Sequence, residues 1–254
     1  MAGNRHLASD EITGGNIYLP GEFEGSMAHK QYNSQYRPQQ YQPPQDDSTW
    51  NRVIRPNTVV FSLIAACTIV YALQNIYWDT MIINFAMWPE NPIPWMFVTS
   101  IFMHGDFSHI FFNMFMLFMF GITLEKMIGH KLFLVLFILA GIVGNMGYVL
   151  FCAATGDMTP AIGASGAIYG VFACLAILAP QIRVYLLFFL PLKIIHAFVL
   201  YAAIDIIFLN TNDSVAHAAH LAGALVGVFF AIYIKQKIAE AKEYKVSYQF
   251  NTGY

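Results

Sequence analysis

The sequence has little charge: aspartate, glutamate, lysine and arginine make up 11% of its 254 residues, whereas 57% of the residues are hydrophobic. Soluble globular domains carry about 25% charged residues. The deficit argues against a water-soluble fold and indicates a membrane protein. The formal net charge of -2 is too small to attract nucleic acid through bulk electrostatics, so we expect no nucleic-acid partner.

Cysteine is also scarce, which excludes a fold built on disulfides. The three cysteines, Cys67, Cys152 and Cys174, each lie within an apolar run, and none has the spacing of a metal-ligand pair. The sequence therefore predicts neither a disulfide framework nor a zinc ribbon. We interpret the three thiols as small core side chains.

Residues 1–56 are polar and poor in aliphatic side chains, and so differ sharply from the rest of the chain. The stretch from Gln31 to Gln45 reads QYNSQYRPQQYQPPQ, and such a composition does not offset its ordering entropy. We expect a disordered cytoplasmic tail over 1–56. This tail also lacks the apolar segment of about 7 to 15 residues found in cleavable signal peptides, so the first apolar span is expected to remain as an uncleaved anchor.

Long apolar runs dominate the rest of the chain. A bilayer core about 30 Å thick requires a helix of about 20 apolar residues, and this measure predicts six transmembrane helices. Their ranges are 57–77, 107–123, 131–154, 165–179, 192–209 and 216–234. We therefore expect an all-α membrane protein with a helical domain over 57–234, followed by a basic cytoplasmic C-terminal tail over 235–254.

Two segments depart from this measure. The connection over 78–99 contains several prolines and is also apolar, with Trp88 and Trp95; we expect it to be embedded in one leaflet with its tryptophans at headgroup level. The fourth helix, with about 15 residues, reaches only about 22 Å. One of its ends should therefore stop inside the membrane, where protein or a water-filled cavity must shelter the non-helical backbone.

The few charges are distributed asymmetrically in this topology. If the N-terminal tail is cytoplasmic, six crossings place all 13 lysines and arginines on the same side as the tail. The opposite side then carries only acidic residues. Because cytoplasmic loops are enriched in lysine and arginine, the pattern predicts a multi-pass protein of the cell membrane with both termini in the cytoplasm.

Polar side chains are costly inside a bilayer and therefore mark candidate functional sites. Ser165 lies at the start of the short fourth helix, and His220 lies in the sixth helix at a similar predicted depth. Taken singly, the serine is explained by a bond to a backbone carbonyl and the histidine by a bond to a neighbour. A serine and a histidine within hydrogen-bond reach, however, are the minimum for general-base activation of a hydroxyl.

Small residues indicate that the fourth and sixth helices approach closely. Two glycine pairs at helical spacing face one another in this interpretation: Gly166 with Gly170, and Gly223 with Gly227. Such pairs let helix backbones approach closely. Close packing would bring Ser165 and His220 together.

His109 and Asn113 lie four residues apart near the outer end of the second helix, and therefore share one face. Acyl transfer develops an oxyanion that needs preorganised donors. We predict that the His109 ring and the Asn113 amide supply them, together with the backbone N–H of Ser165. The alternative is a pair that only makes hydrogen bonds between helices.

Two further polar residues are interpreted as outside the catalytic pair. His217 would need His220 and His109 to form a metal site, and no H-E-x-x-H motif is present. We therefore expect no metal and no cofactor. Asp205, in the fifth helix, is interpreted as a polar contact near the outer surface and not as the third member of a triad.

Together these residues resemble the motifs of the rhomboid intramembrane serine proteases. The resemblance covers about 57–234 and rests on His109, Asn113, Gly163, Ser165, Gly166, Tyr169, Ala219, His220, Gly223 and Gly227. The segment from Gly121 to Glu125, with Gly129, is also similar to the turn that follows the family's second helix. The first loop departs from the family, which often has a Trp-Arg pair where this chain has Trp95 and Met96.

The resemblance implies a six-transmembrane-helix rhomboid-like bundle with a membrane-embedded first loop. It implies Ser165 as nucleophile, His220 as general base, and His109 and Asn113 as oxyanion donors. Tyr169 would pack against His220, and Gly163 would support the pair. The expected partners are the lipid bilayer and substrates with transmembrane helices; no oligomeric state is indicated.

Two other classes of function compete with the peptidase. One is a catalytically silent rhomboid-like protein that binds and routes transmembrane helices, but such a binder requires neither Ser165 nor His220. The other is a transporter with broken helices, which should show inverted repeats, and the sequence shows none.

Overall fold

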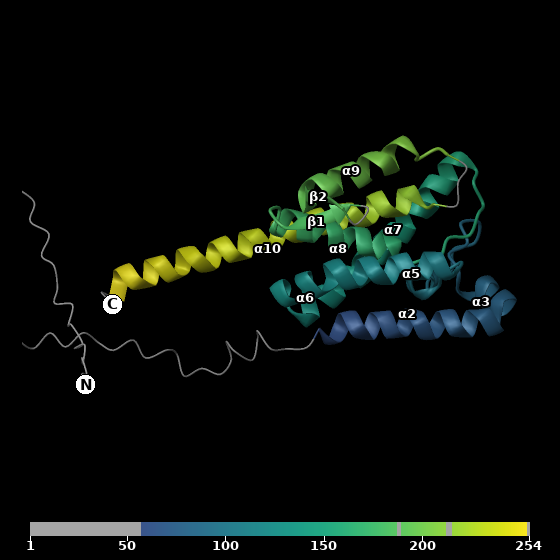
Figure 1. Ribbon diagram of the computed structural model, residues 1–254, viewed down its shortest axis with the longest axis horizontal. Helices are drawn as coiled ribbons and strands as arrows, with labels where there is room; N and C mark the ends of the chain where they lie inside the picture. The colour runs from purple at the N-terminus through teal and green to yellow at the C-terminus, as the bar shows by residue number, and fades with distance from the viewer. Residues whose placement is uncertain (1–56, 187–188, 212–214, 253–254) are drawn as a thin grey trace, which may run out of the picture. The chain divides into compact units, whose positions relative to one another are not determined.

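The computed structural model describes residues 57–186, 189–211 and 215–252, and this part of the chain is mostly helical. The predicted tail over 1–56 lies outside the described residues. The helices are α2 (Thr58–Ile76), α3 (Trp78–Phe85), α4 (Met96–Thr99), η1 (Ser100–Phe102), α5 (Phe107–Met116), η2 (Leu117–Gly121), α6 (Ile122–Ile128), α7 (His130–Thr155), α8 (Ser165–Leu178), α9 (Ile194–Ile207) and α10 (His217–Thr252) (Figure 1).

Four helical segments of the described chain are long and apolar enough to cross a membrane: Thr58–Ile76, Phe107–Ile128, His130–Thr155 and His217–Ala241. The second of these consists of α5 and α6, which are joined by the π-helical turn η2. Helices α8 and α9 are also apolar, but each has only 14 residues. A helix is therefore present in each of the six predicted ranges, and four of the six are long enough to span a bilayer.

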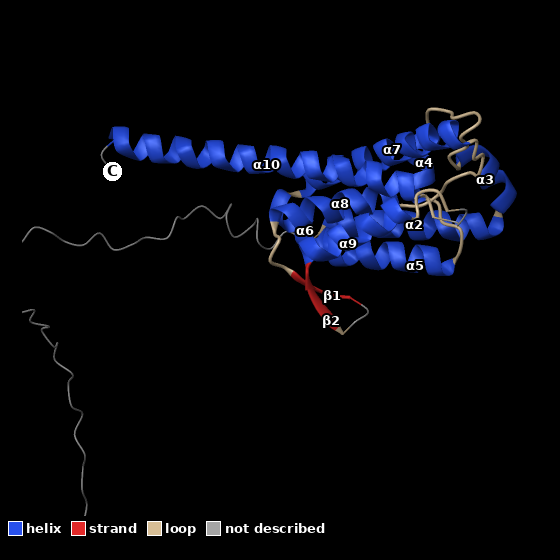
Figure 2. Cartoon of the chain, turned by 90° about the horizontal axis from the view of Figure 1, so that it is seen from above, coloured by secondary structure: helices blue, strands red, loops and turns tan. Residues whose placement is uncertain are grey.

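A β-hairpin corrects the expectation of a purely helical fold. Strand β1 (Arg183–Leu186) pairs antiparallel with β2 (Leu190–Lys193), with Arg183 opposite Lys193. Figure 2 shows the two strands beside the helices. The predicted start of the fifth helix at 192 was thus too early. The hairpin lies within the apolar run 184–192, so hydropathy alone does not distinguish its strands from a helix.

The connection over 78–99 is more ordered than its prolines indicate. Its first half forms α3, and an isolated bridge joins Met87 to Ala161 in the loop before α8. The indole Nε1 atoms of Trp88 and Trp95 donate to the carbonyls of Ile82 and Asn84, both at 2.9 Å. The tryptophans therefore fold this segment onto α3.

A buried carboxylate joins α2, α6 and α7. The oxygens of Glu125 accept hydrogen bonds from the backbone N–H groups of Val59 at 3.0 Å and Val60 at 2.9 Å, and His130 Nδ1 pairs with the same carboxylate. The first N–H groups of a helix have no partner within it, and a negative charge there is favourable. Glu125 therefore caps α2 from another helix.

Helix α8 lies in the core, mainly against α10 and α7. A Cβ atom added to Gly223 would lie 2.1 Å from the carbonyl oxygen of Gly166, and one added to Gly227 would lie 2.1 Å from that of Gly170. No side chain fits at these distances. The four glycines thus let the backbones of α8 and α10 touch, which places the first turns of both helices side by side.

Replacing Gly223 with alanine should destabilise the protein. Alanine is favoured over glycine in a helix by about 1 kcal/mol, so propensity alone predicts a higher melting temperature. The overlap with the Gly166 carbonyl instead forces the helices apart, at a typical cost of about 1–3 kcal/mol. Melting in detergent should therefore occur at lower temperature, whereas Leu225→Ala on the exposed face of the same helix should change it less. An unchanged or raised melting temperature for Gly223→Ala would contradict this packing.

Candidate active site

Ser165 is the first residue of α8, and the preceding loop fixes its position. Gly163 has φ +133°, a conformation that L side chains rarely adopt, and its N–H donates to the Ser100 carbonyl at 2.9 Å. Because Ser165 opens a helix, its backbone N–H has no partner within the helix. Ser165 therefore offers both its side-chain hydroxyl and a backbone N–H group at the start of α8.

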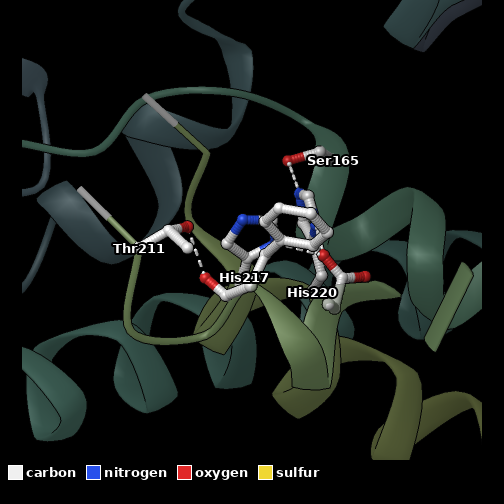
Figure 3. A network of polar contacts seen from close by, with 6 residues as sticks. Ser165, Thr211, His217 and His220 are labelled. Carbon is white, nitrogen blue, oxygen red and sulfur yellow. Dashed lines mark hydrogen bonds and ion pairs between the residues drawn. The ribbon is translucent and has the colours of Figure 1, made fainter. Parts of the chain in front are cut away.

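His220 lies in the first turn of α10, opposite Ser165 (Figure 3). Its Nε2 atom is 2.8 Å from Ser165 Oγ. Tyr169, one turn after Ser165, stacks on the imidazole with ring centroids 4.2 Å apart and planes at 9°. The close approach of α8 and α10 thus produces a serine–histidine hydrogen bond supported by an aromatic ring.

The structure places Asp205 beside His220, whereas the sequence interpretation kept it apart from the serine–histidine pair. The residue is buried in α9, and its Oδ1 atom lies 3.0 Å from His220 Nδ1 and 2.6 Å from His217 Nδ1. An ionised carboxylate only accepts hydrogen bonds, so both Nδ1 atoms carry protons. The described site therefore contains an Asp–His–Ser chain, and a second histidine shares the carboxylate.

His109 and Asn113 come from α5. The Gly105 N–H donates to His109 Nδ1 at 3.3 Å, so the proton of the neutral ring lies on Nε2. A Cβ atom on Gly163 would lie 2.8 Å from that Nε2 and 3.9 Å from Ser165 Oγ. His109 and Ser165 therefore flank one small space, which any side chain at position 163 would fill.

Asn113 is buried, and its amide donates to the carbonyl of His109 at 2.9 Å. An asparagine amide carries two N–H donors, so one is left beyond this bond. Asp106 caps α5 by accepting from the His109 backbone N–H at 2.9 Å. These bonds hold both predicted oxyanion donors at the start of one helix.

A cavity of about 620 Å³ connects these residues, and its lining includes Ser165, His220, His109, Asn113 and Tyr169. Asp157 also borders it, and the Thr159 N–H that donates to this carboxylate at 2.9 Å lowers the pKa of Asp157. Convergent polar groups in one concave site are typical of a ligand or active site. The arrangement therefore combines a histidine that can deprotonate a hydroxyl with N–H donors that lie next to that hydroxyl.

The metal set considered from sequence is not the cluster that forms. His217 and His220 lie together with Asp205, whereas His109 faces Gly163 and packs edge to face on His104, with centroids 5.1 Å apart. For the Asp205 contact, the one signal in the sequence was its predicted depth, close to that of His220.

Comparison with known proteins gives a consistent family match. A model of the rhomboid domain matches residues 92–237. The chain is 30% identical over 205 residues to the human presenilin-associated rhomboid-like protein, mitochondrial, covering 76% of this chain and 53% of that protein. It is also 30% identical over 150 residues to rhomboid protein 1, mitochondrial, of Saccharomyces cerevisiae, covering 58% of this chain and 43% of that one.

The chain thus spans about half the length of these relatives. The domain match nevertheless extends over more than half of the chain and includes α8, α9 and α10 as far as residue 237. Together with four helices capable of crossing a bilayer, the match shows a multi-pass membrane protein that belongs to the rhomboid family.

Proposed function

We propose that this protein is an intramembrane serine endopeptidase that cleaves peptide bonds in or near transmembrane segments of other membrane proteins. The observation that carries the proposal is the 2.8 Å hydrogen bond between Ser165 Oγ and His220 Nε2, at the wall of a polar cavity in a rhomboid domain. The reaction uses a serine–histidine pair and no cofactor.

The attack begins with proton transfer. Ser165 Oγ adds to the carbonyl carbon of the substrate peptide bond while His220 Nε2 accepts the hydroxyl proton. Nε2 must be unprotonated beforehand. Asp205 favours this tautomer because it accepts the Nδ1 proton at 3.0 Å; it acts as a positioning residue, and the stacked Tyr169 holds the ring plane.

The oxyanion formed by the attack is stabilised by donors on two helices. The backbone N–H of Ser165 at the start of α8, the Nε2–H of His109 and the amide of Asn113 supply them. His220 then returns its proton to the leaving amine, which breaks the C–N bond and leaves an acyl ester on Ser165. A water molecule from the cavity hydrolyses this ester with His220 again as base.

The membrane arrangement proposed from sequence fits this chemistry. Residues 57–234 form the catalytic domain and cross six times, with α8 and α9 as short spans, and the 78–99 segment is embedded in one leaflet. Both termini, including the tails 1–56 and 235–254, are cytoplasmic, so the serine faces the opposite side. A substrate helix moves in sideways and unwinds locally, because helical hydrogen bonds otherwise shield its peptide bonds.

The test is cleavage of a single-span reporter by the full chain reconstituted in liposomes. Wild-type protein should release two fragments, and Ser62→Ala, on the exposed face of α2, should do the same. A folded wild-type protein that cleaves no reporter from a library of single-span sequences, yet retains those helices on a column, would favour the catalytically silent binder.

A further inference from the structure

The proposed peptidase does not explain His217. Proton transfer requires His220 Nε2, and orientation of that ring requires one carboxylate oxygen. His217 nevertheless places its Nδ1 atom 2.6 Å from Asp205 Oδ1, closer than His220 does, and its side chain is also buried. Figure 3 shows His217 and His220 at the start of α10, and their ring centroids lie 6.2 Å apart with planes at 85°. Two buried rings thus share one carboxylate.

We propose that Asp205, His217 and His220 form a binding site for a divalent cation, with zinc as the best match, and that zinc at this site switches the peptidase off. The inhibitory half of this inference rests on the proposed function; the binding half does not.

The donor set fits zinc. One ligand atom from each of the three residues lies within 4.8 Å of the other two. Two imidazole nitrogens and one carboxylate oxygen form a set that zinc prefers, at about 2.0–2.2 Å from the metal, with a water molecule as fourth ligand. Tetrahedral ligands at these distances are about 3.3 Å apart. The nitrogens lie 2.6 Å and 3.0 Å from the carboxylate oxygen, so zinc binding requires both pairs to widen and the oxygen to move off the Nδ1–H axes, where the metal would sit.

The fold presents the site in an accessible place. His217 and His220 are three residues apart on α10 and so lie on neighbouring turns of one face. Both line the cavity that holds Ser165. A hydrated cation can therefore reach them by the route that the hydrolytic water takes, and the fourth ligand position can be filled from the cavity.

Binding of zinc and catalysis require different tautomers of His220. In the peptidase, Nδ1 carries the proton and Nε2 is the base. A metal on Nδ1 occupies the lone pair of that atom, so its proton leaves to solvent and Nε2 takes one up; the ring stays neutral. An Nε2–H group can donate to Ser165 Oγ but cannot accept its proton. The metal-bound site is therefore unable to activate the serine.

The binding test uses Ser165→Ala protein, so that catalysis plays no part. After dialysis against ZnCl2 with excess MgCl2, mass spectrometry of metals should find one zinc per chain. In this background, His217→Gln and Asp205→Asn should weaken zinc binding by about 100-fold or more, while His196→Gln, exposed on α9, should not. Size-exclusion profiles check folding, and Co²⁺ should give the visible absorption of a tetrahedral site. No retained zinc, or equal retention by folded His217→Gln, would overturn the site.

The switch is tested on wild-type protein with a fluorophosphonate probe. Stoichiometric ZnCl2 should suppress labelling at least tenfold, and EDTA should restore it. Unchanged labelling with zinc bound would overturn the switch but not the site. Failure of the proposed function gives a different result: zinc-free wild-type protein would neither label nor cleave while still binding zinc, which refutes the peptidase and with it the switch.

Discussion

Ser165→Ala is expected to abolish reporter cleavage, with a fall in rate of about 10⁴-fold or more. The hydroxyl is the only group proposed to form a bond to the substrate carbon, so no neighbouring side chain replaces it. His220→Ala should lose a similar factor, because Ser165 Oγ then has no base at 2.8 Å. The measurement is the initial rate of fragment release in liposomes, with chelator present to exclude zinc.

The double variant separates a catalytic pair from two independent contributions. If Ser165 and His220 act as one unit, Ser165→Ala with His220→Ala should be no slower than either single variant. Melting temperatures close to that of the wild type show that the loss is chemical. Cleavage at more than one tenth of the wild-type rate by Ser165→Ala would assign the nucleophile to another residue.

Asp205→Asn is expected to lower kcat by about 10²–10⁴-fold with little change in KM. An asparagine can turn its amide toward His220 Nδ1, and donation from that amide favours the proton on Nε2, which is the wrong tautomer for a base. Asp79→Asn, an exposed acidic residue on α3, serves as the matched control. Cleavage rates are measured over a range of substrate concentrations in EDTA.

A purely structural role for Asp205 predicts a different pattern. Loss of the carboxylate would then lower the melting temperature, and kcat and KM would change together. Asp205→Glu separates the two roles further, because a carboxylate on a longer side chain can still accept the Nδ1 proton and should restore part of kcat. Wild-type kcat in folded Asp205→Asn would remove Asp205 from the mechanism.

The proximity of Ser165 and His220 could be inferred from sequence because two local signals agree. Gly166 and Gly223 indicate a close helix crossing, and the short fourth helix places its start below the membrane surface. The crossing then leaves little freedom: Gly166 O would lie 2.1 Å from a Cβ on Gly223. Glycine spacing is a local pattern, and it encodes a tertiary contact directly.

The contact of Asp205 with His220 is not encoded by a local sequence pattern such as the glycine spacing. Apart from His196 and Asp205, helix α9 is almost entirely apolar, and it has no glycine pair, so its sequence does not indicate which side turns toward α10. The position of the carboxylate depends on how α9 rotates when it packs, and this rotation is fixed by many weak contacts. The β1–β2 hairpin was missed for a related reason, since apolar strands and apolar helices have the same hydropathy.

If His220 activates Ser165, fluorophosphonate labelling of the full chain in zinc-free liposomes should require both residues. Peptide mass spectrometry should find the phosphonyl group on Ser165 of the wild type, with labelling reduced at least 100-fold in His220→Ala. Labelling of His220→Ala at the wild-type rate would show that His220 does not activate the nucleophile, and an adduct on a serine other than Ser165 would show that Ser165 is not the nucleophile.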